Sequence, residues 1–197
     1  ILSPSPDYPL WTACATLAGG KAVHYICDEQ SEWYPDMEDI KRKVNSRTKA
    51  IVLINPNNPT GALYPREVLQ QIVDIAREHQ LMIFSDEIYD RLVMDGEEHV
   101  SIASLAPDLF CVTFSGLSKS HMIAGFRIGW MILSGNKAIA RDYIEGAFVP
   151  MFLHRQLSRQ HLAAIRVSMI TSFLVDVFMN RESLFIMHCV ISLVSVQ

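Results

Sequence analysis

Short apolar runs alternate with longer amphipathic stretches over the first three-quarters of the chain. The apolar runs lack a clean two-residue alternation, which is typical of strands buried on both faces of a sheet. They predict strands over residues 22–27, 50–54, 81–85, 110–114 and 128–133. The stretches between them predict helices over 8–17, 36–44 and 65–79, the last with apolar positions at helical spacing after Pro65.

The order of these elements indicates the fold class. Strands that alternate with helices imply right-handed crossovers, and therefore an α/β fold with three α/β/α layers around a mostly parallel sheet. In such sheets ligands bind outside the carboxyl ends of the strands. Asn58, Asp86 and the segment 115–119 each follow a predicted strand, so we expect them to share one site.

The pattern changes after residue 146, which is where we place a domain boundary. Residues 147–197 contain no glycine, lysine, tyrosine or tryptophan, and their apolar runs cover 167–175 and 183–196. Those runs are shorter than the roughly 18–20 apolar residues of a membrane-spanning helix, so we expect no membrane segment. We expect an apolar tail that is helical or poorly ordered, and we hypothesise that it was spliced on or is read out of frame. The chain begins at Ile1 without an initiator methionine, which suggests a piece of a longer sequence.

Composition narrows the class of protein further. With 50% hydrophobic and 19% charged residues, the chain has enough apolar material for a substantial core. A net charge of -4 gives no electrostatic basis for binding nucleic acid or an anionic membrane. The four cysteines show neither a CxxC pair nor a metal-binding spacing with histidine, so we predict buried thiols in a reducing, cytoplasmic location and no metal site.

Four short motifs carry the candidate chemistry. They are Asn-Pro-Asn-Asn-Pro-Thr-Gly at 55–61, Ser-Asp-Glu-Ile-Tyr at 85–89, Phe-Ser-Gly-Leu-Ser-Lys at 114–119 and Gly-Phe-Arg-Ile-Gly at 125–129. Together they hold the asparagine, aspartate, tyrosine, lysine and arginine that a pyridoxal phosphate site requires. This ordered set resembles the large domain of class I, fold-type I aminotransferases, nearest to the alanine aminotransferase-like branch. The resemblance extends over about residues 1–146 and implies that the small domain is largely missing.

The resemblance implies a role for each matching catalytic residue. Lys119 would bind the cofactor as a Schiff base in a desolvated pocket and move protons, while Asp86 would face the pyridine nitrogen. Tyr89 and Asn58 would hold the phenolic oxygen, with a cis peptide bond at Asn58-Pro59. Taken singly, Asp86 also suits a cap, Tyr89 a core aromatic and Asn58 a plain turn. Glu87 is expected to point away from Asp86 and receives no role.

Other residues match positions around the phosphate and the ring. Arg127 is a planar bidentate cation suited to phosphate, and either Ser115 or Ser118 would add a hydroxyl donor. The resemblance leaves open which serine this is, because Gly116 stands where many relatives have serine. Tyr8 would stack on the face of the cofactor ring, whereas Trp11 is interpreted as a core or interface aromatic.

The implied function is amino transfer between an alanine-like amino acid and the 2-oxo acid 2-oxoglutarate, in a homodimer. Two alternatives stay open. The chain could be a truncated, non-catalytic remnant with weak or no cofactor binding, because no arginine here matches the family's substrate-carboxylate arginine. It could also belong to a pyridoxal-phosphate-dependent lyase or synthase of the same fold.

Overall fold

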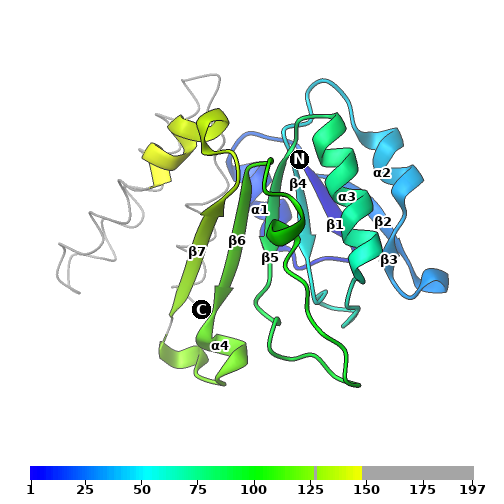
Figure 1. Cartoon of the computed structure of the whole chain (residues 1–197), viewed down its shortest axis with the longest axis vertical. Helices are drawn as coiled ribbons and strands as arrows, with labels where there is room; N and C mark the ends of the chain where they lie inside the picture. Colours follow the sequence, from blue (N-terminus) through cyan, green and yellow to red (C-terminus); the bar gives the residue numbers. More distant parts are fainter. Residues whose placement is uncertain (127, 148–197) are drawn as a thin grey trace.

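A seven-stranded sheet in the order β3-β2-β1-β4-β5-β6-β7 runs through the computed structural model, which describes residues 1–126 and 128–147 (Figure 1). Strands β1, β2, β4, β5 and β6 are parallel, whereas β3 and β7 pair antiparallel with their neighbours. The predicted α/β class with a mostly parallel sheet is therefore confirmed. The strands are β1 (Leu2–Ser5), β2 (Val23–Asp28), β3 (Tyr34–Pro35), β4 (Ala50–Ile54), β5 (Met82–Asp86), β6 (Cys111–Gly116) and β7 (Gly129–Ser134).

Helices cover both faces of the sheet. Helix α1 lies on one face, and α2 and α3 lie on the other (Figure 1). The helices are α1 (Leu10–Leu17), α2 (Met37–Lys43), α3 (Arg66–Glu78) and α4 (Leu117–Ser120), and the short 3-10 segments are η1 (Glu29–Ser31), η2 (Ile102–Leu105), η3 (Ala124–Phe126) and η4 (Lys137–Ala140). The three predicted helices are confirmed to within two residues at each end, and α4 was not predicted.

Alternate residues of the central strands belong to two separate hydrophobic cores. Ile51 and Leu53 of β4 pack in the core that includes the buried stripe of α3. Val52 and Ile54 pack in the other core, beside Trp11 of α1. Since neighbouring strand residues point to opposite faces, this division establishes the three predicted layers.

Strand β1 was missed because a proline lies inside it. Pro4 has no N–H to donate, so the sequence 2–5 does not resemble a central strand. The structure places Pro4 opposite Tyr25 of β2, while the pairing toward β4 is limited to Leu2 and Ile51. The strand therefore tolerates Pro4 because the ladder toward β4 does not extend to that residue.

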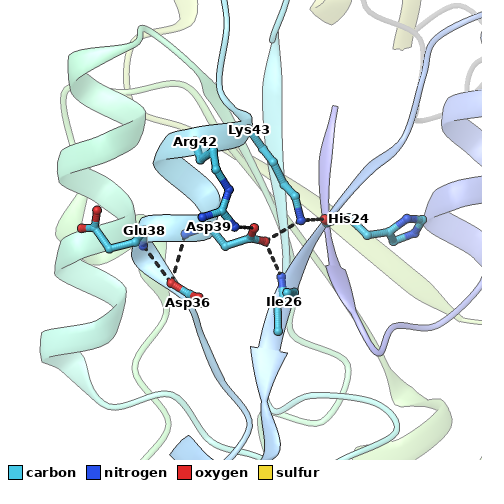
Figure 2. Close-up of polar contacts among 7 residues, drawn as sticks. All are labelled: His24, Ile26, Asp36, Glu38, Asp39, Arg42 and Lys43. Atoms are coloured by element: carbon cyan, nitrogen blue, oxygen red, sulfur yellow. Dashed lines mark hydrogen bonds and ion pairs between the residues drawn. The ribbon is translucent and has the colours of Figure 1, made fainter.

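An ion-pair network around one buried carboxylate fastens α2 to β2 (Figure 2). Asp39 is fully buried and accepts from the Lys43 ammonium at 2.5 Å, from the Arg42 guanidinium and from the Ile26 N–H at 2.9 Å. Lys43 also donates to the backbone oxygen of His24 at 2.6 Å. Burial by itself would raise the pKa of Asp39, but these donors outweigh it and the pKa is lowered. Helix α2 is therefore held against β2 by a buried carboxylate whose negative charge is balanced by these donors.

The structure also bears on the cysteine and membrane expectations. Cys14, Cys27 and Cys111 are buried and form no disulfide among the described residues. Within 1–126 and 128–147, no helix has the length and apolar character needed to cross a membrane. No cluster of metal-ligating side chains occurs over that same part of the chain. The tail predicted for 147–197 lies outside the described residues except for Ala147, as does Arg127.

Candidate active site

Most of the predicted site residues that the structure describes lie at or just after the ends of three adjacent parallel strands, β4, β5 and β6. Asp86, the last residue of β5, lies in register with Ile54 of β4 and Phe114 of β6. The N–H of Asn55 donates to the backbone oxygen of Asp86 at 3.0 Å. The loops that leave these strands therefore begin at one level of the sheet, as the placement of the motifs predicts.

The Asp86 side chain lies on the α1 face of the sheet. Its Oδ2 accepts from Trp11 Nε1 at 3.4 Å, and its Oδ1 accepts from the N–H of Ile88 at 3.2 Å. Burial raises the pKa of Asp86 to about 6, and these two long hydrogen bonds offset only part of that effect. A carboxylate in such surroundings gains from a cationic N–H partner. The site thus fits the protonated pyridine nitrogen of pyridoxal phosphate.

Lys119 and Tyr89 lie next to each other. The Lys119 ammonium is 5.5 Å from the centre of the Tyr89 ring, a distance that allows a cation–π contact. Lys119 is exposed, however, so the described residues do not give it the desolvated pocket that was expected. The physical reason is its position on α4, a single helical turn beyond the end of β6, where one side of the side chain meets water.

The two candidate serines lie on either side of Gly116. Ser115 Oγ donates to the backbone oxygen of Glu87 at 3.3 Å, and Ser118 is half-buried on α4. A Cβ at Gly116 would lie 2.7 Å from the backbone oxygen of Ile128, so only glycine lets β6 and β7 approach here. This close approach fixes the start of α4 and hence of the lysine-bearing turn. Which serine would meet a phosphate stays open, and the predicted partner Arg127 is outside the described residues.

Asn58 lies in the loop that follows β4. The loop contains the cis peptide bond Asn58-Pro59, as the resemblance implied. Its shape is held by Asn57, whose Oδ1 accepts from Thr60 N at 3.3 Å and whose Nδ2 donates to Tyr64 Oη at 3.3 Å. The turn interpretation of this motif is therefore correct, and it leaves Asn58 half-buried at the edge of the site.

Three further residues bear on the predictions for the surroundings of the site. Tyr8, proposed to stack on a ring, is partly buried and packs against the α1-side core, so its stacking stays a prediction. Trp11 belongs to that core as expected, and it also holds Asp86. Glu87, to which no role was given, is buried on the opposite face and accepts from Ser85 Oγ and Ser101 Oγ, each at 2.9 Å. The sequence did contain a sign that Glu87 would be buried. Two adjacent residues at the end of a central strand point to opposite faces of the sheet, and both faces are covered.

Comparison with known proteins adds the family context. The model of the family "Aminotransferase class I and II" matches residues 1–181. The glutamate-pyruvate aminotransferase AlaA of Haemophilus influenzae is 64% identical over 146 residues, which is 74% of this chain and 36% of that protein. The AlaA protein of Escherichia coli K12 is 61% identical over the same shares. The chain thus spans little more than a third of the length of these curated relatives.

Solved structures agree with the fold. The crystal structure of an Escherichia coli aminotransferase superposes with a TM-score of 0.71 and 46% identity, covering 98% of this chain and 41% of that chain. The alanine aminotransferase of Pyrococcus furiosus gives a TM-score of 0.67 and 32% identity, with 98% and 42% covered.

Proposed function

This chain belongs to the class I and II aminotransferase family, and we propose that it forms the cofactor-binding part of a pyridoxal-phosphate-dependent aminotransferase. The proposed reaction moves an amino group between an alanine-like amino acid and 2-oxoglutarate. The observation that carries the proposal is the half-buried Asp86 carboxylate at the carboxyl end of the sheet, with its raised pKa and its weak hydrogen bonds. The similarity to glutamate-pyruvate aminotransferases supports the choice of substrates.

Each residue would act at a definite atom. Bound pyridoxal phosphate supplies an aldehyde that reacts with amines and a ring that withdraws electrons from the substrate Cα. Asp86 would keep the ring nitrogen protonated through a charge-assisted hydrogen bond. Tyr89 and Asn58 would donate to the phenolic oxygen. Lys119 Nζ would anchor the cofactor and then carry a proton to and from the substrate Cα.

The remaining candidates would orient the cofactor. Arg127, with Ser115 or Ser118, would bind its phosphate, and Tyr8 would cover the ring face. Because the chain spans 36% of the curated relatives' length, the activity of the whole protein is part of the proposal. So are its amino acid and 2-oxo acid substrates, its homodimeric assembly and a cytoplasmic location.

The first experiment tests cofactor attachment. Pyridoxal phosphate is added to the purified chain, the visible absorption band is recorded, and the complex is reduced with borohydride for peptide mapping. We expect the label on Lys119, its loss in K119A, and its retention in K137A, which removes another exposed lysine. A folded chain with no band, or with label spread evenly over the lysines, would contradict the proposal and favour a non-catalytic remnant.

A second assay separates amino transfer from other chemistry of the same fold. The full-length protein is incubated with alanine and 2-oxoglutarate. Formation of glutamate and pyruvate supports the proposal, whereas release of ammonia would favour a lyase.

A further inference from the structure

Directly behind Asp86, the structure holds a second buried acid whose surroundings call for a function. Glu87 is 5% exposed, and its side chain lies on the α3 face of the sheet. Its Oε1 accepts from Ser85 Oγ and from Ser101 Oγ, both at 2.9 Å. The two hydroxyl donors share Oε1, the backbone N–H of Ile102 also interacts with the carboxylate, and Oε2 is the oxygen that faces a further side chain.

That partner is a buried histidine. His99 Nε2 lies 3.8 Å from Glu87 Oε2, and the His99 side chain is 11% exposed. Nε2 is fully enclosed yet has no hydrogen-bond partner among the described residues. A buried ring nitrogen that faces a carboxyl oxygen at this distance needs only a small approach to share a proton with it.

The pair is attached to the ends of three strands of the candidate site. The Glu87 N–H donates to Phe114 O of β6 at 2.8 Å, and Ser115 Oγ donates to Glu87 O at 3.3 Å. His99 is also hydrogen-bonded to the backbone of Asn55, at the start of the loop that carries Asn58. A change at the pair would therefore reach the ends of β4, β5 and β6 together.

We propose that Glu87 and His99 form a positioning pair, which holds one proton between Oε2 and Nε2 and thereby fixes the loop that carries Asn58 and the strand end that carries Asp86. Glu87 touches neither substrate nor cofactor in this scheme and acts through its neighbours. The inference rests on the proposed function of the site, because the loops it orders are those of the cofactor residues.

The charges around the pair are compatible with one shared proton near neutral pH. Burial raises the pKa of Glu87 to about 7, and Asp90 adds to the rise, whereas the two serine hydroxyls and the Ile102 N–H oppose it. Burial lowers the pKa of His99, with Asp90 acting the other way and Arg91 adding to the fall. Cys111 of β6 is the further titratable group near Glu87, and burial raises the pKa of its thiol to about 12, which keeps it neutral. The acid keeps its proton to a higher pH than usual, and the imidazole takes one up only at a lower pH than usual. Between these two pH values the pair holds one proton.

The test uses the full chain and three variants. E87Q supplies a permanent N–H donor toward His99 and an oxygen for the serines, so it imitates the protonated pair. E87A removes both. E98Q makes the same charge change at an exposed acid in the same loop and serves as the control. Urea unfolding without cofactor and the dissociation constant for pyridoxal phosphate are measured at pH 6 and pH 8.5.

For cofactor binding, we expect E87Q to match the wild type at pH 6 and to bind about threefold or more tightly than the wild type at pH 8.5, where the wild-type pair has lost its proton. We expect E87A to bind about tenfold more weakly at both pH values, and E98Q to follow the wild type. A ratio between E87Q and the wild type that does not change with pH would overturn the shared proton. Wild-type affinity in E87A would overturn the positioning role.

The unfolding data keep this inference separate from the proposed function. If the pair holds a proton, the wild type loses stability relative to E87Q between pH 6 and pH 8.5, even in a chain that binds no cofactor. A folded chain that never binds pyridoxal phosphate but shows this relative loss would overturn the proposed function and leave the proton pair standing. The same stability difference at both pH values would overturn the pair.

Discussion

Replacing Asp86 by asparagine should stabilise the cofactor-free chain while abolishing cofactor binding. The pKa of Asp86 rises from 3.8 to about 6 on folding, because burial disfavours the charged carboxylate. An acid whose folded-state pKa is raised destabilises the fold wherever it is ionised. The cost is absent below pH 3.8, grows between 3.8 and about 6, and is complete above that value.

The size of the effect follows from these values. A rise from 3.8 to about 6 corresponds to about 3 kcal/mol of unfavourable free energy at neutral pH. Asparagine avoids this cost and keeps one oxygen, which accepts from the Ile88 N–H. It loses the acceptor for Trp11 Nε1, a long bond that contributes about 1 kcal/mol at most. The D86N chain should therefore be about 2 kcal/mol more stable above pH 7 and slightly less stable than the wild type below pH 4.

Urea unfolding at pH 4 and pH 8 measures the difference, with D142N as the control because Asp142 is exposed. Added pyridoxal phosphate should raise the stability of the wild type and leave D86N unchanged, since ligand that binds only the folded state stabilises it. A D86N chain that is less stable than the wild type at pH 8 would refute the reasoning about burial. So would a stability difference that does not depend on pH.

Three further predictions concern single residues. D39N should lower the free energy of unfolding by about 1–3 kcal/mol in a urea titration at pH 7, because it takes the charged acceptor away from Lys43 and Arg42, whereas E38Q at the surface should change it by less than about 0.5 kcal/mol. G116A should destabilise the chain by about 1–3 kcal/mol and weaken cofactor binding, since its Cβ meets the β7 backbone, while a Cβ at Gly125 meets nothing within 4 Å, so G125A should leave the free energy of unfolding nearly unchanged. K119A should unfold within about 0.5 kcal/mol of the wild type, as expected of an exposed side chain, yet lose the borohydride label; a large loss of stability would contradict the surface position seen here.

Much of the central fold was predictable because local patterns and global packing agree there. Strand β4 is confirmed over residues 50–54, and α3 differs from its prediction by one residue at each end. Both elements are strongly apolar on the faces they bury. Strand β1 was hidden by Pro4, and α4 is too short to leave a periodic signal. The antiparallel direction of β7 depends on tertiary pairing, which local periodicity does not encode.

The candidate site was likewise predictable in part from the sequence. The motifs predicted that Asn58, Asp86 and the lysine-bearing segment share one end of the sheet, because parallel strands bring their carboxyl ends together. Exposure of Lys119 and burial of Glu87 with His99 could not be read from those motifs. They depend on which side chains from distant segments close over each residue, and such contacts arise only when the whole sheet is assembled.

Asp86 ends β5 and Glu87 follows it directly, so the register of this strand decides which of the two acids belongs to the site. Asp86 faces α1 and Glu87 faces the opposite layer, and the choice between them is set by the pairing of Ile83 with Ile51 and of Phe84 with Val52. A slip of one residue would exchange the two faces and present the proton-sharing glutamate where the aspartate now stands. The packing of these aliphatic and aromatic side chains, which contact no ligand, thus determines which of the two acids faces the cofactor.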